Sequence, residues 1–248
     1  MRVRELTLTA LAFAFAILWV GGLASYLVLK GPPAASRWAA PAFLALSGII
    51  VLVSAQAADR MALLGWGILG WSVELLGVHT GIPFGRYHYT GVLFPLVAGV
   101  PVAMGCAWIV LLAYVQQMMI GWTLPGWARP LLGAIWMTAI DLVMEPLAVG
   151  QLGYWRWSEG GSYYGVPLSN FTGWFLVSLA LFLLYRRPMV ANVWARWIGA
   201  SVILFFTILA LGSSLVLPAM MGVILFALHA GFSLSAARHP PAEAGRSR

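Results

Sequence analysis

Residues 61–78 read MALLGWGILGWSVELLGV, an apolar run that carries a single acid, Glu74, near its end. A helix needs about 20 predominantly apolar residues to cross a bilayer core, and this run is close to that length. Runs of the same kind recur at about 6–29, 38–58, 93–120, 127–149, 167–185, 190–211 and 214–235. We therefore predict an all-α fold, a polytopic transmembrane helical bundle of about eight spans, or seven if the last two form one re-entrant unit.

The composition of the 248 residues supports this class. Hydrophobic residues make up 62% of the chain, charged residues only 8%, and the mean hydropathy is +0.90. A soluble domain carries about 25% charged residues, so too few charged groups remain here to cover a water-facing surface. A single cysteine, Cys106, excludes an internal disulfide framework and a multi-cysteine metal cluster. Lys30, the only lysine, ends an apolar run, which argues against a retinal-type Schiff base inside the bundle.

The arrangement expected is one transmembrane helical domain at 1–238 and a disordered tail at 239–248. The first apolar run is too long for a signal-peptide core and predicts a membrane anchor. With the N-terminus in the cytoplasm, segments on that side hold 10 of the 14 Lys and Arg residues. The positive-inside rule then places both termini in the cytoplasm. The net charge of +7 therefore indicates topology and not nucleic-acid binding.

Two predicted loops, at 79–92 and 150–166, are long and rich in aromatic residues, and they fall on the same membrane face. Gly85-Arg86-Tyr87-His88-Tyr89 and Gly153-Tyr154-Trp155-Arg156-Trp157 share the pattern Gly-x-aromatic-x-aromatic, and Gly-Val-Pro follows each of them. One interpretation is a parallel repeat of a helix–loop–helix unit whose two loops form one lid. The other is coincidence, in a chain with 13 Trp and 27 Gly.

Three of the seven acidic residues, Glu74, Asp141 and Glu145, fall inside apolar spans. An ionised carboxylate at membrane depth is costly, so such residues usually face an interior cavity and have a function. Asp141 and Glu145 are four residues apart and share one helix face. Glu74 and Glu145 both lie about 6 Å from the loop ends of their spans. The alternative is structural, with each acid paired to Arg86 or Arg156 or hydrogen-bonded to a neighbouring helix.

Pro146 directly follows Glu145 and lacks an N–H group, so we expect it to kink or end the helix and to free the carbonyl of Leu142. Two carboxyls as close as those of Asp141 and Glu145 cannot both ionise easily in a low dielectric. At least one is therefore expected to keep its proton near neutral pH. A retained proton beside an ionised neighbour suits general acid catalysis.

The remaining candidates are histidines and aromatic residues. His79 and His88 flank the first loop, but no third ligand has metal-site spacing, so we expect no metal and a hydrogen bond from His79 to the acids instead. The aromatic residues form either an interfacial belt or a set of ring faces that stabilise a cation. They include Trp155, Trp157, Tyr163, Tyr164 and Trp174.

The stretch 74–89, ELLGVHTGIPFGRYHY, resembles the signature of the carotenoid biosynthesis membrane-protein family, the CruF-type carotenoid 1′,2′-hydratases. A second block is also similar, with DLVMEP at 141–146, YWRW at 154–157 and YYGVPLSNFTGW at 163–174. The resemblance implies water addition across the terminal double bond of an acyclic carotenoid end group. The product would be a tertiary alcohol, formed without a cofactor.

The resemblance also suggests roles for the residues in these blocks. Asp141 or Glu145 would donate the proton, and Glu74, with His79, would orient and deprotonate the attacking water. Tyr87, Trp155 and Trp157 would shield the cation. The substrate-binding residues would be Arg86, Tyr87, Tyr89, Trp155, Trp157, Tyr163, Tyr164 and Asn170.

The partners expected are the lipid bilayer, the carotenoid substrate and other enzymes of the carotenoid pathway. A pI of about 10.1 favours a bacterial inner-membrane protein acting on lycopene or a γ-carotene-type compound over an archaeal one acting on C50 carotenoids. Two other classes stay open. A proton-coupled transporter would have acids near mid-membrane and broken helices, and a carotenoid-binding subunit would have no activity.

Overall fold

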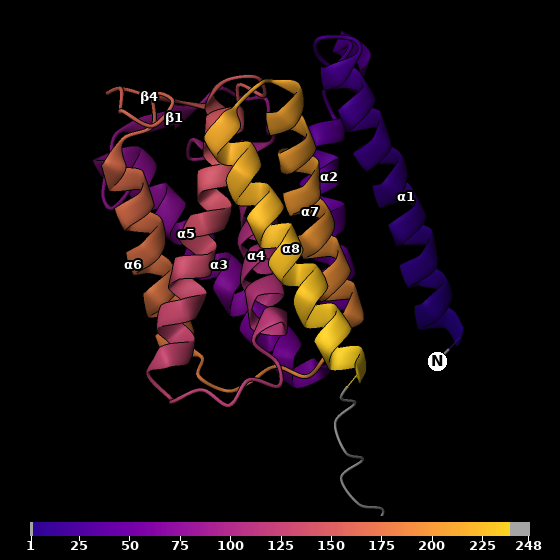
Figure 1. The fold of residues 1–248 in the computed structure, drawn as a ribbon. Coiled ribbons are helices and arrows are strands. Elements are labelled where there is room, and N and C mark those ends of the chain that lie inside the picture. The colour runs from indigo at the N-terminus through magenta and orange to yellow at the C-terminus, as the bar shows by residue number, and fades with distance from the viewer. Residues whose placement is uncertain (1, 239–248) are drawn as a thin grey trace, which may run out of the picture.

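The computed structural model describes residues 2–238, so the expected tail at 239–248 lies outside the described residues. The described part forms eight α-helices that run side by side as one bundle (Figure 1). The helices are α1 (Arg2–Leu27), α2 (Ala39–Ser54), α3 (Ala57–Thr80), α4 (Met104–Met118), α5 (Ala128–Val149), α6 (Leu168–Leu184), α7 (Val193–Gly212) and α8 (Val216–Arg238). The predicted helical membrane bundle is thereby confirmed.

Five helical stretches have the length and hydropathy of membrane spans: α1, Ala34–Ser54 (α2 with the short 3-10 helix Ala34–Ser36 before it), α3, α5 and α7. Helices α4 and α6 and the apolar part of α8 are shorter than such spans. The predicted span at 93–120 was wrong at its start, because α4 begins only at Met104. Residues 93–103 are apolar but form two short paired strands and turns, and Pro95 and Pro101 lack the N–H groups that a helix needs. A turn at Ser213 separates α7 from α8, so these two predicted spans are separate helices.

Four short strands lie at one end of the bundle. They are β1 (Tyr87–Tyr89), β2 (Leu96–Val97), β3 (Val100–Pro101) and β4 (Trp155–Trp157). Strand β1 pairs antiparallel with β4, and β2 pairs with β3. The two long loops therefore meet, as predicted, and we call residues 81–103 and 150–167 together the lid. The start of α1 and the end of α8 lie at the opposite end (Figure 1).

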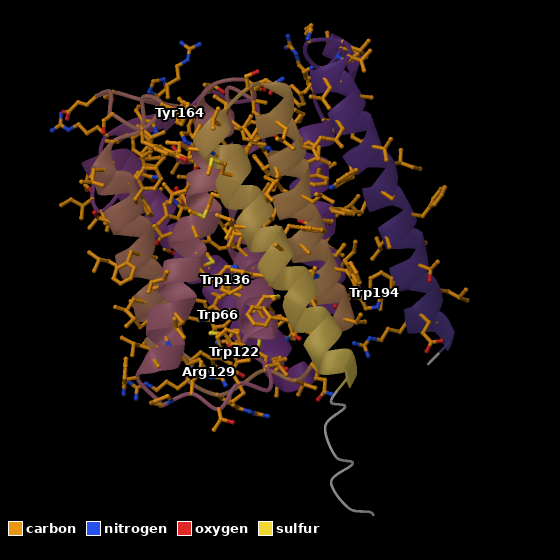
Figure 2. The ribbon with its side chains drawn as sticks, viewed as in Figure 1. Trp66, Trp122, Arg129, Trp136, Tyr164 and Trp194 are labelled. Atoms are coloured by element: carbon orange, nitrogen blue, oxygen red, sulfur yellow. The ribbon has the colours of Figure 1, made fainter. Side chains whose placement is uncertain are left out.

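Helix α4 forms the centre of the bundle. All of its residues from 107 to 118 are buried, because α2, α3, α5 and α7 pack around it. Helix α1 instead lies at the edge and leans away from the other helices (Figure 1). Aromatic side chains occur toward both ends: Tyr164 lies at the lid end, and Trp122 lies in the opposite half (Figure 2). This distribution is typical of interfacial aromatic belts.

The lid has the reciprocal contacts expected of two repeated units. The backbone N–H of Thr90 donates to the carbonyl of Tyr154, and that of Ser158 donates to the carbonyl of Arg86. Thr90 and Ser158 occupy matching positions of the two sequence patterns, as do Arg86 and Tyr154. Contacts that recur in this way are those made around a two-fold axis.

A second contact crosses the same axis. Trp108 of α4 and Trp174 of α6 each follow the Pro of a Gly-Val-Pro sequence by seven residues. Their rings stack, with centroids 4.3 Å apart and planes inclined by 14°. Matching residues that touch each other support a parallel repeat over coincidence. The two units are α3–lid–α4 and α5–lid–α6.

Candidate active site

Glu74 is buried in α3 beneath strand β1. The hydroxyls of Tyr87 and Tyr89 donate to its Oε2 at 2.5 and 2.9 Å, and Trp108 Nε1 donates to its Oε1 at 3.2 Å. Alternate residues of a strand point to the same face, so both tyrosines of β1 reach down to the helix that precedes them. The three donors occupy both oxygens of Glu74, which therefore needs no cationic partner.

Two glycines of α3 make room for these donors. A Cβ atom at Gly70 would lie 2.3 Å from the ring of Trp108, and one at Gly77 would lie 3.0 Å from the Tyr87 hydroxyl. Contacts as close as 2.3 Å do not occur for real Cβ atoms. The small residues of the run at 61–78 therefore have a direct purpose, because they let two aromatic side chains approach the acid.

Glu145 occupies the matching position in α5, beneath strand β4. The indole nitrogens of Trp155 and Trp157 both donate to its Oε1, at 2.8 and 2.7 Å. Indole is a donor only, so both rings must be held by an acceptor, and one carboxyl oxygen serves them both. Among the described residues, no side chain donates to the second oxygen, Oε2, of Glu145.

Asp141 lies one turn before Glu145 on the same face of α5. Asn170 of α6, also buried, donates from Nδ2 to Oδ2 of Asp141 at 2.6 Å. Within residues 2–238 the other oxygen, Oδ1, likewise has no hydrogen-bond donor. The pair Asp141 and Glu145 therefore offers two uncommitted carboxyl oxygens, whereas Glu74 offers none.

Tyr87 connects the two halves of the site. Its hydroxyl bonds Glu74, and its ring centroid lies 5.0 Å from that of Trp157, which bonds Glu145. Burial first, and then the carboxyls of Glu74 and, to a lesser extent, Glu145 raise the pKa of Tyr87 above its ordinary value. Asp141 lies one turn from Glu145 on the same face of α5. The three carboxyls consequently belong to one site, with 1–4% of each residue exposed.

Pro146 does not end its helix, since α5 continues to Val149. The proline does leave the carbonyl of Leu142 without its usual donor, as the sequence predicts. The hydroxyl of Tyr163, from the second loop, donates to this carbonyl at 2.9 Å. Burial, together with the neighbouring Tyr164 and Asp141, raises the pKa of Tyr163 to about 12, so it remains a donor at neutral pH.

The arginines proposed as partners of the acids lie elsewhere. Arg86 and Arg156 are both exposed, on the outer side of the lid. Strand alternation explains this for Arg156, whose neighbours Trp155 and Trp157 point inward. The acids are held by Tyr, Trp and Asn donors from neighbouring elements. Of the two structural alternatives, hydrogen bonding is therefore the one that the structure contains.

His79 is also outside the cluster. It is exposed, and its Nδ1 lies 3.0 Å from the carbonyl of Leu75 in its own helix. Five helical positions separate it from Glu74, which turns the two side chains about 140° apart around the axis. Tyr164 is exposed as well, and its hydroxyl accepts the backbone N–H of Leu217 at 3.4 Å.

Trp108 is the member of the site that the sequence patterns did not single out. It lies in the central helix, where a tryptophan reads as ordinary core. Its spacing from the Gly-Val-Pro sequence at 99–101, equal to that of Trp174 from the sequence at 165–167, was the signal that could have identified it.

Comparisons with known proteins point in one direction. A family model described as carotenoid biosynthesis protein matches residues 39–229, which include all three acids and the whole lid. A bisanhydrobacterioruberin hydratase from Haloarcula japonica is 32% identical over 145 residues, which are 56% of this chain and 48% of that protein. The chain thus matches about half the length of that relative. No solved structure matches.

Proposed function

The chain belongs to the carotenoid biosynthesis protein family, and from this premise we propose that it is a carotenoid hydratase. It adds water across the terminal C-1′,2′ double bond of an acyclic end group, in lycopene or a γ-carotene-type compound. The observation that carries the proposal is the cluster of three buried carboxyls beneath one aromatic lid. Hydration of a trisubstituted alkene requires an acid strong enough to protonate carbon, groups that stabilise the resulting cation, and a positioned water molecule.

The reaction requires one proton transfer in each direction. A carboxylic acid donates its proton to C-2′, and the π electrons form the new C–H bond, which leaves a tertiary cation at C-1′. The oxygen of water bonds to C-1′, and a carboxylate accepts the proton that this oxygen loses. A well-placed acid or base contributes about 10²–10⁴-fold each. The net change is alkene plus water to tertiary alcohol, and the enzyme regains its starting charge.

Asp141 and Glu145 are the acids we assign to these transfers. They share one face of α5, and each keeps an oxygen that no protein donor occupies. One donates the proton and the other receives the proton of the water. Glu74, with both oxygens occupied, holds Tyr87 and Tyr89 in place. The alternative that Glu74 is the base for water stays a prediction.

The rings of Tyr87, Trp155 and Trp157 are the proposed shelter for the cation. Each ring lies on a strand that covers a carboxyl. A cation over an aromatic face is stabilised by about 0.5–2 kcal/mol. Tyr89 packs against the ring of Tyr87 and positions it. Tyr163 positions the carbonyl of Leu142, and Asn170 positions Asp141. We leave His79, Arg86 and Tyr164 out of the catalytic assignment because all three are exposed.

Expression in a host that makes lycopene tests the proposal. Mass spectrometry of extracted pigments should show a mass gain of one water for each reacted end group. The same host without the protein is the control for host enzymes. Unchanged pigment from normally inserted protein would contradict the hydratase. A transporter predicts that result, but the acids lie toward the lid end and α5 continues through Pro146, unlike a broken transport helix.

The cellular setting is proposed on the charge distribution. The protein is a multi-pass protein of a bacterial inner membrane, with both termini in the cytoplasm and the lid on the outer face. The start of α1 and the end of α8 lie at the same end of the bundle, which fits this arrangement (Figure 1). Reporter fusions at residue 1 and at the lid turn after residue 158 would test the orientation.

A further inference from the structure

A large cavity lies beside the lid, away from the three acids. Its volume is about 580 Å³, within the usual range of small-molecule sites. Its walls come from α1, α2, α7 and the lid. Six of the lining residues mark its sides: Ile17, Gly21, Ser25, Phe43, Phe205 and Tyr154. We call this space the α1 cavity.

The lining of the α1 cavity suits an apolar chain. Phe43 stacks on Phe15 with centroids 4.8 Å apart and lies 5.4 Å from Phe205, so one side is an aromatic surface. A Cβ atom at Gly21 would meet nothing within 4 Å, which leaves the α1 side open. Arg37, the charged residue of the lining, is exposed at the turn before α2.

One layer of the lid separates this cavity from the acids. Tyr154 lines the cavity, and the next residue, Trp155, donates to Glu145. The two rings lie 6.1 Å apart. Thr90 also lines the cavity, and its hydroxyl donates to the carbonyl of Gly153 at 2.6 Å. The seam where the two loops meet therefore lies between the cavity and the acid site, and the end group of a chain held in the cavity would pass through this seam to reach the acids.

We propose that the α1 cavity binds the polyene chain of the carotenoid substrate, behind the end group that reacts at the acids. This inference rests on the proposed function and extends it to the rest of the substrate. The lining of α1 from Ile17 to Tyr26 extends about 13 Å along the helix, a suitable wall for a rigid rod. A full carotenoid is longer, so its far end passes α1 into the lipid.

Filling the cavity tests the proposal. The double variant Gly21→Phe/Ser25→Phe places two rings on the cavity side of α1. The matched control, Gly65→Phe/Ser72→Phe, places the same rings on one outer face of α3, where Gly65 also has nothing within 4 Å. Lycopene is titrated into purified full-length protein, and the visible circular dichroism of the bound polyene is recorded. We expect about tenfold weaker binding for the filled variant, because apolar contact area is lost, and no change for the control.

The possible outcomes test polyene binding in the α1 cavity separately from hydratase activity. Equal lycopene binding by the filled variant and the wild type would overturn the inference, and so would absent binding by the wild type. Loss of co-purified phospholipid alone, with lycopene binding intact, would also overturn it and make the cavity a lipid site. Wild-type protein that binds lycopene in the cavity but forms no alcohol would refute the hydratase and leave the cavity assignment standing.

Discussion

The two repeated units hold a buried glutamate in the same way, but they differ in how many of its oxygens accept hydrogen bonds. In each, a strand with alternating aromatic residues folds back over the helix that carries the glutamate. Glu74 accepts three donors on two oxygens, and Glu145 accepts two donors on one. Both oxygens of Glu74 are therefore hydrogen-bonded, whereas one oxygen of Glu145 has no donor among the described residues.

A single position accounts for much of this difference. Four residues before Glu74 stands Gly70, and four residues before Glu145 stands Asp141. The glycine admits Trp108, which completes the coordination of Glu74. The aspartate instead adds a second carboxyl with its own partner, Asn170. The comparison teaches that the same scaffold leaves both oxygens of Glu74 hydrogen-bonded in one unit and places a second carboxyl beside Glu145 in the other, depending on a residue one turn away.

Removal of the extra acid should have the largest effect. Asp141→Asn keeps the shape but cannot donate or accept the proton, so turnover should fall about 10²–10⁴-fold. The yield of hydrated pigment per inserted protein measures this. Glu159→Gln, which changes an exposed acid of the lid, is the control and should leave turnover unchanged. Full activity of Asp141→Asn would show that the two units do not differ in the way we describe.

The next largest effect is expected at Glu74. It distinguishes a Glu74 that holds the tyrosines in place from a Glu74 that acts as the base for water. Glu74→Gln has one acceptor oxygen, so one of its donors is left unpaired, and stability should fall by about 1–3 kcal/mol. Turnover should fall by much less than in Asp141→Asn. Thermal unfolding and pigment yield are measured together. A variant as inactive as Asp141→Asn but fully stable would identify Glu74 as the base for water.

The aromatic residues over Glu145 should respond to loss of the ring more than to loss of the N–H. Trp157→Phe keeps a ring face and should lower turnover only slightly. Trp157→Leu removes the face and should lower turnover by a few fold more, since a cation–ring contact is worth about 0.5–2 kcal/mol. The ratio of the two initial rates is the measurement. Equal rates would assign Trp157 to hydrogen bonding alone.

The smallest effect is expected at Tyr163, whose hydroxyl bonds the carbonyl that Pro146 leaves free. Tyr163→Phe should lower stability by about 1 kcal/mol and leave turnover nearly unchanged. The shift of the thermal unfolding midpoint checks this. Glu74 has no such proline after it, so an unfolding midpoint of Tyr163→Phe equal to that of the wild type would remove this distinction between the units.

Sequence reasoning predicted the relative placement of the acids and the two loops better than the path of the chain around them. The acids and the two loops follow from local rules, since helical spacing puts Asp141 beside Glu145 and span parity puts both loops on one face. The start of α4 does not follow, because residues 93–103 are as apolar as a span although they form short strands and turns of the lid. The donors to Glu74 include Trp108 from another helix, and such long-range packing is not encoded in local patterns.

The pairing of β1 with β4 joins the two units through one short ladder. The ladder contains only three residue pairs, and such a short ribbon separates at low free energy compared with the helices around it. Each strand carries the rings over its own acid, so separation of the ribbon would uncover Glu74 and Glu145 in the same event. In the proposed hydration, arrival of the hydrocarbon and exclusion of bulk solvent would both depend on this one ribbon.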